Sequence, residues 1–503
     1  MLQPRSTQQP WAGPFSGTNL PVGPPAALLH LVLLIVLVAG LVTYVPSATA
    51  APAMSVDDEL ASFVDEYRKT QGLPGISYTV LDDGEVTASG GSGTLQADTP
   101  VPIASVSKPF TAFAVLQLVD DGDIRLDDPV TSVLPEFSVG GTDPDAITIR
   151  MLLSHTSGLP QPTILPETGS YTQSVANIAD LSVVSAPGTT HTYSNLNYRT
   201  LARLVEVVTG TPFDQYLEEK IFTPLGMDDT TSVISTRESE VFDKGHVTAY
   251  GTAIPLRAMA SDVGGAGGMV STAEDLAAFL AMIQRGGVTA DGSRLLSADL
   301  VQEAMTKQEK AGTYGLGWQH TSTAHPQRVG HDGVLRRTSS RIDVVPSNGT
   351  ATVVLLDSYT PAYLHPFTVS TGLVDIARGE TPQVPAPVAT YIDLGLLVIT
   401  LVVIALAVRG VLRSRLWAER RRQKRPWRRI VRFVPLTVMP VAAIFLFLVL
   451  TIGPNSPATP VDVFGLWPAA TILLLVDAIA SVVVGIARLL RLRAAAIRSR
   501  ASS

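Results

Sequence analysis

Three apolar runs near the C-terminus constrain the fold of this chain more than any other feature. They cover residues 394–411, 433–453 and 464–487, and each is about long enough to cross a bilayer as a helix. The stretch Arg409–Arg432, which begins at the end of the first run, carries eleven Lys/Arg and one acid, whereas the loop between the second and third runs carries no basic residue. By the positive-inside rule, we expect the basic loop and the C-terminus in the cytoplasm and the preceding region outside.

The charge distribution separates the same two parts of the chain. Residues 391–503 carry 16 Lys/Arg and 4 Asp/Glu, a net charge of +12, whereas the remaining residues carry a net charge of −19. This split argues against nucleic acid as a partner and favours a lipid bilayer around the basic part. The chain has no cysteine, which excludes disulfides and thiolate nucleophiles.

The N-terminus carries a fourth apolar run, residues 26–45, which is followed by the small residues Ala48-Thr49-Ala50. This pattern is typical of an export signal, and it leaves open whether the segment is cleaved or retained. The sequence therefore predicts a signal peptide or N-terminal anchor (1–53), an exported domain (54–378), a proline-rich linker (379–392) and a three-helix transmembrane domain (393–503).

Hydrophobic patterning indicates the fold class of the exported domain. Alternating segments flank Asp83-Gly84 and Asn348-Gly349, which predicts a β-hairpin near each end of the domain. Helical periodicity dominates between them, for example over Leu201–Val208. We expect an α/β fold in which a mainly antiparallel sheet is built from both termini and an all-helical lobe is inserted. The glycine-rich segment 264–268 lacks the Gly-Lys-Ser/Thr ending of a nucleotide site and is interpreted as a structural turn.

The candidate chemistry begins at Ser105, which precedes an apolar helical pattern. If a helix begins there, Ser105 and Lys108 share one face because they are three residues apart. A partly desolvated lysine can lose its proton and activate a serine hydroxyl as a nucleophile. Ser-x-x-Lys alone is common and is more often structural than catalytic, so the interpretation depends on other motifs.

Two further motifs supply complementary groups. Tyr193-Ser194-Asn195 precedes a helix, where a tyrosine phenolate favoured by Lys108 could move protons and the Asn195 amide could bind a substrate amide. His331-Asp332-Gly333 precedes a strand-like segment, and a glycine there would let a substrate backbone lie close to the strand edge. Asp332 could face the cleft or point away, since alternate residues of a strand face opposite sides.

In this order and spacing the three motifs resemble those of the penicillin-recognising serine hydrolases, in the branch that contains class C β-lactamases, D,D-carboxypeptidases and D-aminopeptidases. The resemblance implies a β-lactamase/transpeptidase-like three-layer fold and a serine hydrolase that needs no cofactor or metal. By the same resemblance, Ser105 is the acylated nucleophile and Lys108 and Tyr193 transfer protons. The implied substrate ligands are Asn195, His331 and Gly333, and the implied oxyanion-hole donors are the backbone N–H groups of Ser105 and Val334.

The order of signal, hydrolase domain and three helices also resembles membrane-bound peptidases that remove an acyl-D-amino-acid cap from prodrugs, as in colibactin maturation. We therefore expect a multi-pass protein of the bacterial cytoplasmic membrane whose hydrolase domain faces the periplasm or exterior and cleaves a small-molecule or peptide amide or ester. The alternatives are a β-lactamase or D,D-carboxypeptidase acting on cell-wall peptide, and a non-catalytic penicillin-binding sensor. The sequence leaves the oligomeric state open.

The third motif bears on substrate choice. His331 stands where many β-lactamases have a lysine that receives a substrate carboxylate, and a histidine with an ordinary pKa is mostly neutral at pH 7. Arg336 or Arg337 is an alternative source of positive charge. We expect the loss of the lysine ammonium to outweigh any charge from these arginines. The site should then favour substrates whose scissile bond is not flanked by a free carboxylate.

Overall fold

The computed structural model describes residues 55–161, 167–257, 261–321, 324–421, 424–452 and 460–501. The N-terminal apolar run and its predicted role as signal or anchor lie outside these residues.

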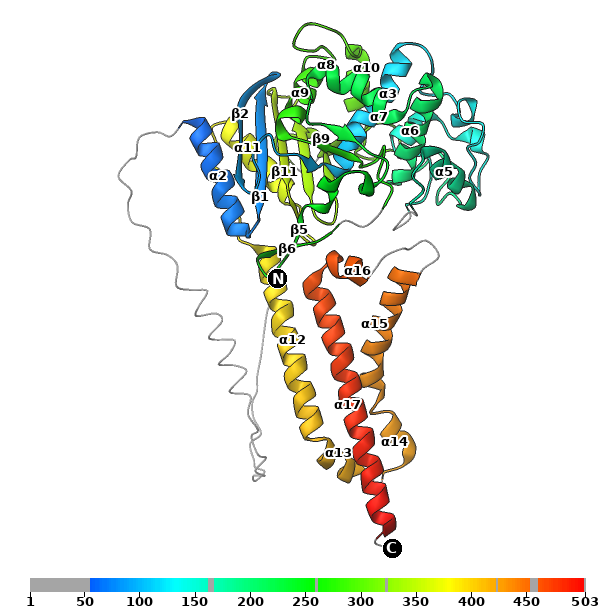
Figure 1. The fold of residues 1–503 in the computed structure, drawn as a ribbon, viewed down its shortest axis with the longest axis vertical. Coiled ribbons are helices and arrows are strands. Elements are labelled where there is room, and N and C mark those ends of the chain that lie inside the picture. Colours follow the sequence, from blue (N-terminus) through cyan, green and yellow to red (C-terminus); the bar gives the residue numbers. More distant parts are fainter. Residues whose placement is uncertain are drawn as a thin grey trace, which may run out of the picture. The chain divides into compact units, whose positions relative to one another are not determined.

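A six-stranded antiparallel sheet forms the centre of the hydrolase domain (Figure 1). Its strand order is β2-β1-β11-β10-β9-β8. In chain order the strands are β1 (Gly75–Asp82), β2 (Glu85–Gly93), β8 (Gln319–Thr321), β9 (Arg328–Val334), β10 (Ser339–Val344) and β11 (Thr350–Leu356). Both predicted hairpins form, and the strands nearest the two ends of the domain, β1 and β11, pair at the centre. The predicted antiparallel sheet closed from both termini is therefore confirmed.

Helices cover both faces of this sheet, giving three layers. Helices α2 (Val56–Gln71) and α11 (His365–Ala377) bury side chains such as Phe63 and Leu373 against one face. Helix α9 (Ala273–Gln284) packs on the other face, against β1 and β11. Ser55 caps α2 by accepting a hydrogen bond from the Asp58 N–H.

The inserted lobe is mainly helical, as predicted, but it is not free of strands. Its helices are α3 (Ser107–Asp120), α4 (Ile149–Leu153), α5 (Tyr171–Ala176), α6 (Asn195–Thr209), α7 (Phe213–Leu217), α8 (Thr223–Leu225) and α10 (Ala298–Met305). Two small sheets accompany them, β3-β7-β4 (Val101–Pro102, Met269–Ser271, Thr231–Ser232) and β12-β5-β6 (Ser358–Tyr359, His246–Ala249, Thr252–Pro255). Strands of two to four residues are too short to show alternation in a sequence, which is why they were not predicted.

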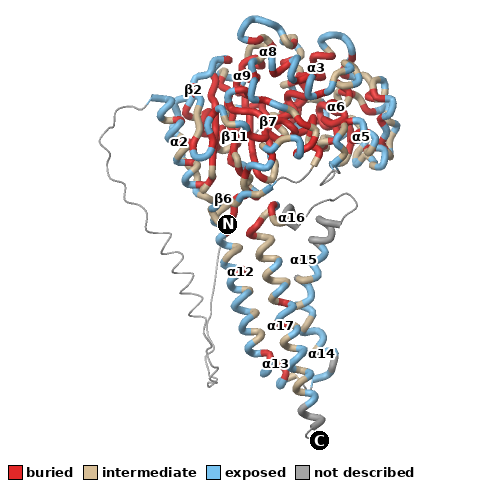
Figure 2. Tube along the Cα trace, in the orientation of Figure 1, coloured by how far each residue is buried: buried red, intermediate tan, exposed pale blue. Residues whose placement is uncertain are grey.

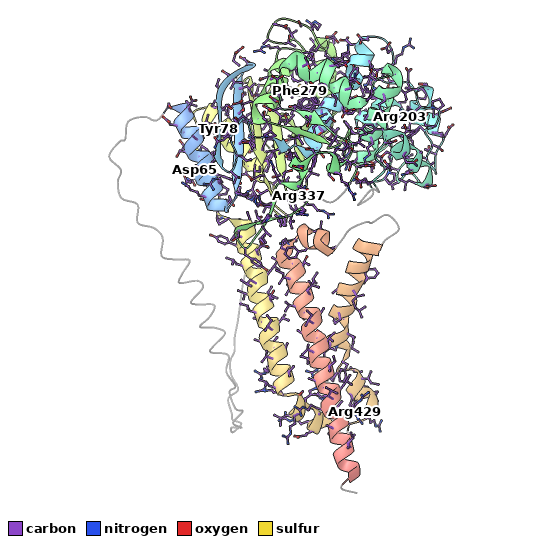
Figure 3. The ribbon with its side chains drawn as sticks, in the orientation of Figure 1. Asp65, Tyr78, Arg203, Phe279, Arg337 and Arg429 are labelled. Carbon is purple, nitrogen blue, oxygen red and sulfur yellow. The ribbon has the colours of Figure 1, made fainter. Side chains whose placement is uncertain are left out.

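Helix α3 runs through the interior and carries the Ser-x-x-Lys motif at its start. Nearly all of its residues are buried, which Figure 2 shows as a red core. Phe110 stacks on Phe279 of α9 with ring centroids 3.9 Å apart, and Figure 3 labels Phe279 at this junction of lobe and sheet. This packing fixes the helix that positions the candidate nucleophile.

The C-terminal part is helical: α12 (Val388–Leu412), α13 (Ser414–Arg421), α14 (Pro426–Ile430), α15 (Val434–Ile452), α16 (Pro460–Leu466) and α17 (Pro468–Ala501). By length and composition, α12 and α17 could cross a membrane. Helix α15 corresponds to the second predicted run, but its apolar stretch within the described residues, Val434–Phe445, is shorter than a span. Of the three predicted spanning helices, two therefore have the length and composition of a span and the third does not, and the crossing itself stays a prediction.

Candidate active site

The backbone before Ser105 presents its hydroxyl at the start of α3. Ala104 has a left-handed backbone (φ 52°), which is uncommon for a residue with a Cβ and marks local strain. Ser105 lies in a 3₁₀ turn that continues into α3. The Ser107 hydroxyl holds this turn by donating to the Ala104 carbonyl at 2.7 Å and accepting from the Met269 N–H at 3.2 Å. The predicted helix start thus places Ser105 and Lys108 on one face.

Lys108 lies inside the site with three polar neighbours. Its Nζ is 3.0 Å from Ser105 Oγ, 2.8 Å from Asn195 Oδ1 and 2.7 Å from the Ala266 carbonyl oxygen. The side chain is fully buried, and this burial, followed by the positive charge of Arg199, lowers the pKa of Lys108 well below its ordinary value. The neutral amine is thereby favoured at the position where a base would meet the Ser105 proton.

The glycine-rich segment 264–268 brings the Ala266 carbonyl to Lys108. A Cβ on Gly265 would fall 2.5 Å from the Tyr198 carbonyl oxygen, and one on Gly268 would fall 2.2 Å from the Val233 carbonyl oxygen. Glycine is therefore required for the close approach. The sequence correctly indicated a structural turn but missed this contact, because a backbone acceptor leaves no side-chain signature.

Tyr193 completes the contacts to the serine. Its hydroxyl donates to Ser105 Oγ at 3.0 Å, and Lys108 Nζ lies 4.8 Å from its ring centroid. Burial raises the pKa of Tyr193 above its ordinary value, so the side chain is a neutral phenol. The expectation of a phenolate favoured by Lys108 is wrong for the free site, because desolvation of the anion dominates.

His155 supports the loop that carries Tyr193. Its ring lies 4.3 Å from the Tyr193 ring, centroid to centroid, and its Nδ1 accepts from the Ser194 N–H at 3.2 Å and from the Asn197 amide at 2.9 Å. Burial lowers the pKa of His155 well below its ordinary value. The neutral His155 ring therefore holds the second motif in place through the two hydrogen bonds that its Nδ1 accepts.

His331 is buried next to the site and is also neutral. Its Nδ1 donates to the Asp332 carbonyl oxygen at 2.6 Å and its Nε2 accepts from the Tyr314 hydroxyl at 2.8 Å. Burial is the main cause that lowers the pKa of His331 to about 3. Both ring nitrogens are therefore occupied within the protein, and the ring offers no positive charge to a substrate.

Gly333 has a structural role besides the substrate-binding role predicted for it. A Cβ at this position would fall 2.1 Å from the Ile103 carbonyl oxygen. The glycine therefore lets β9 approach the segment before Ser105, and its contact with a substrate backbone stays a prediction. Asp332 points away from this side and pairs with Arg341, one of the two orientations that strand alternation allowed.

Of the two alternative cations, Arg336 is partly exposed and Arg337 is already engaged. The Arg337 side chain is 5% exposed, and its Nη1 donates to the Leu256 carbonyl oxygen at 3.2 Å; Figure 3 labels the residue. Within the described part of the chain, no group of three or more His, Asp or Glu side chains gathers as a metal site. The assembled polar groups are those of nucleophilic acyl transfer, namely a serine hydroxyl, a desolvated amine and a phenol.

Sequence comparison leads to the same class. Residues 60–365 match the beta-lactamase family. The chain is 31% identical to penicillin-binding protein 4 of Amycolatopsis lactamdurans, with 65% of this chain and 91% of the relative aligned. It is 28% identical to the D-alanyl-D-alanine-carboxypeptidase/endopeptidase AmpH of Escherichia coli K12, with 58% of this chain and 81% of the relative aligned.

Solved structures share the fold. The octameric penicillin-binding protein homologue from Pyrococcus abyssi matches with a TM-score of 0.56 at 25% identity, covering 66% of this chain and 80% of that one. The D-amino acid amidase from Ochrobactrum anthropi SV3 matches in fold with a TM-score of 0.54 at 23% identity, covering 65% and 99%. Fold and site together define a serine hydrolase. The chain belongs to the beta-lactamase family.

Proposed function

We propose that this chain is a membrane-anchored, extracytoplasmic hydrolase that cleaves an amide or ester through an acyl-enzyme on Ser105. The observation that carries the proposal is the convergence of Lys108 Nζ and the Tyr193 hydroxyl on Ser105 Oγ, each at 3.0 Å. Both lie within the distance at which a proton is transferred directly.

The surroundings of Lys108 suit a neutral amine as the base. Asn195 Oδ1 and the Ala266 carbonyl oxygen are acceptors only, and they take the two N–H bonds of such an amine. Its lone pair is then directed at Ser105 Oγ. As Oγ attacks the scissile carbonyl carbon, its proton passes to Lys108, and the oxygen of the tetrahedral intermediate is received by the N–H groups of Ser105 and Val334.

Tyr193 suits the next proton transfer. Its phenol donates a proton to the leaving nitrogen or oxygen as the carbonyl–leaving group bond breaks, and Lys108 returns the serine proton to the tyrosine. Hydrolysis of the acyl-enzyme uses the same groups in reverse, with water in place of the leaving group. Because all the proton-transfer groups for deacylation are present, turnover is favoured over a sensor that remains acylated.

The charge of the site supports a substrate class. His331 is neutral, Arg337 is engaged by a carbonyl, and Arg341 is paired with carboxylates. A charge-assisted contact contributes roughly 1.5–3 kcal/mol, or about ten- to a hundredfold in rate or affinity. We therefore propose an amide of D-amino-acid type with no free carboxylate beside the scissile bond, such as an acyl-D-amino-acid cap on a prodrug, ahead of a β-lactam or a cell-wall peptide terminus.

The membrane part of the proposal rests on charge and hydropathy. Residues 54–378 would form the exported hydrolase, joined by the linker 379–392 to a multi-pass anchor in the bacterial cytoplasmic membrane. Helices α12 and α17 have the required length and composition, and eleven basic residues lie in the stretch Arg409–Arg432. This arrangement would leave the catalytic domain outside and the C-terminus in the cytoplasm.

A substrate panel on the purified full-length protein tests the proposal. We expect turnover of D-amino-acid p-nitroanilides or short p-nitrophenyl esters, loss of this turnover in Ser105→Ala, and retention in the surface control Ser132→Ala. We expect poor hydrolysis of the β-lactam nitrocefin. A nitrocefin kcat/KM of about 10⁶ M⁻¹s⁻¹ or more, in the range of well-matched pairs, would contradict the substrate class, and full activity of Ser105→Ala would contradict the nucleophile.

A further inference from the structure

A buried cluster of four charged side chains lies behind the third motif. Arg341 of β10 stands directly opposite Asp332 of β9 in the sheet register. Its Nη1 donates to Asp332 Oδ1 at 2.6 Å, and its Nε and Nη2 donate to the two oxygens of Asp343 at 2.5 and 2.7 Å. The Arg341 side chain is only 3% exposed. The guanidinium is therefore committed to two carboxylates, one of them on the strand of the third motif.

The cluster is charge-balanced and tied to its surroundings. Arg328, the second cation, lies 3.7 Å from Asp343, and both side chains are fully buried. The Ser370 hydroxyl of α11 donates to Asp343, and Arg341 Nη2 donates to Thr321 Oγ1 of β8 at 2.8 Å. Two cations and two anions cancel, so the cluster does not need an external ion.

One end of β9 depends on this cluster more than the other. Strand β8 pairs with β9 only from Arg328 to Gly330, so among the described residues β10 alone pairs with positions 331–334. The Asp332–Arg341 pair is a cross-strand contact within this singly paired end. Gly333, next along the strand, contacts the Ile103 carbonyl just before Ser105. A shift of this end would therefore move the Val334 amide relative to the nucleophile.

We propose that Arg341 is a positioning residue for the hydrolytic reaction and acts through Asp332. By fixing the singly paired end of β9, the ion pair holds the Val334 N–H where the oxygen of the tetrahedral intermediate forms. The inference rests on the proposed roles of Ser105 and Val334. Removing an oxyanion-hole donor costs about 10²–10³ in kcat, and its displacement costs a part of that.

Asp332→Ala in the full-length protein gives the cleanest test, because Arg341 keeps Asp343 as its partner and the Asp332 side chain is 25% exposed. We expect kcat for a p-nitrophenyl ester to fall at least about fivefold with KM within about twofold, and the rate of Ser105 labelling by a fluorophosphonate to fall in parallel. Glu85→Ala is the matched control, since it removes an ion-paired carboxylate from the far edge of the same sheet. Its kinetics should equal those of the unaltered protein.

Arg341→Lys and the Asp332→Ala/Arg341→Lys double variant test the coupling. We expect the double variant to be no slower than the slower single variant, because each change removes the same Asp332–Arg341 contact. Additive losses, or Asp332→Ala within twofold of the unaltered protein, would overturn the proposal. If Arg341→Lys does not fold, the Asp332→Ala kinetics decide alone. Failure of the proposed function gives a different result, since Ser105→Ala would then still be labelled or active.

Discussion

Gly333 of β9 and Ile103, two residues before Ser105, meet backbone to backbone. A Cβ on Gly333 would lie 2.1 Å from the Ile103 carbonyl oxygen and 2.1 Å from Ser340 Oγ, which itself donates to that carbonyl at 2.6 Å. The third motif is therefore packed against the segment that carries the nucleophile, and the spacing between the two sides of the site is set by the absence of a side chain.

Gly333→Ala should consequently separate the two sides of the site. We expect at least a tenfold loss of kcat for a p-nitrophenyl ester and a lower free energy of unfolding by about 1–3 kcal/mol, the usual cost of overpacking. Steady-state kinetics and thermal unfolding measure the two effects. Gly395→Ala is the control, because nothing lies within 4 Å of a Cβ at that helical position. Normal activity of Gly333→Ala would show that the contact can relax.

Lys108→Ala and Tyr193→Phe should each lower turnover by roughly a hundredfold or more while the protein stays folded, because each removes a group proposed to carry a proton. Tyr193→Phe keeps the ring against His155 and loses only the hydroxyl bonded to Ser105. Steady-state kcat and circular dichroism would be measured together. A Tyr193→Phe variant with unaltered kcat would assign the leaving-group proton to another donor.

The pH profile should show the lowered pKa of Lys108. The base works only when neutral, so kcat/KM should fall as the pH drops through the pKa of Lys108, at a pH well below the usual lysine range. The positive charge of Arg199 lowers this pKa further, so Arg199→Met should raise it and move the acid limb to higher pH.

Arg203→Met is the control for that shift. Arg203 lies on the same helix α6 but pairs with Glu136 and Glu206, and its removal should leave the acid limb in place. Figure 3 labels Arg203 on this outer part of the lobe. If the pH profile is the same in Arg199→Met and in the unaltered protein, the acid limb does not arise from protonation of Lys108.

Topology can be tested with reporter fusions. Reporters placed after residue 385 and near residue 458 should read as external, and those near residue 422 and at the C-terminus as cytoplasmic, because eleven basic residues lie in the stretch Arg409–Arg432 and none in the loop 454–463. A cytoplasmic reading at residue 385 would contradict both the topology and the export of the hydrolase.

Local patterns predicted much of the fold because their physics is local. Asp83-Gly84 specifies a tight turn with both residues in the left-handed region, and the first hairpin forms around it. The helix after Thr272 shows the limit of such reasoning. Ser271 and Thr272 are both suitable N-cap residues, and the structure uses Thr272, whose side chain accepts from the Asp275 N–H. Adjacent hydroxyl residues give nearly the same signal.

The site was less predictable where it depends on distant contacts. The sequence brought Ser105, Lys108, Tyr193 and Asn195 together as motifs, and the structure places all four within one hydrogen-bonded group. The sequence did not indicate that the Tyr314 hydroxyl would hydrogen-bond to His331, nor that Arg341 would form an ion pair with Asp332. Pairing of side chains across strands or loops depends on tertiary packing, which a single sequence does not encode in any local pattern.

The glycines around Ala266 limit how this enzyme could be re-engineered. A Cβ on Gly264 would fall 2.3 Å from the Tyr171 hydroxyl, and a Cβ on Gly265 or Gly268 would clash with a backbone carbonyl oxygen. A mutational library that varies this segment would displace the acceptor of Lys108 and return mainly inactive clones. Changes of selectivity would have to come from residues outside this segment that do not hold the lysine.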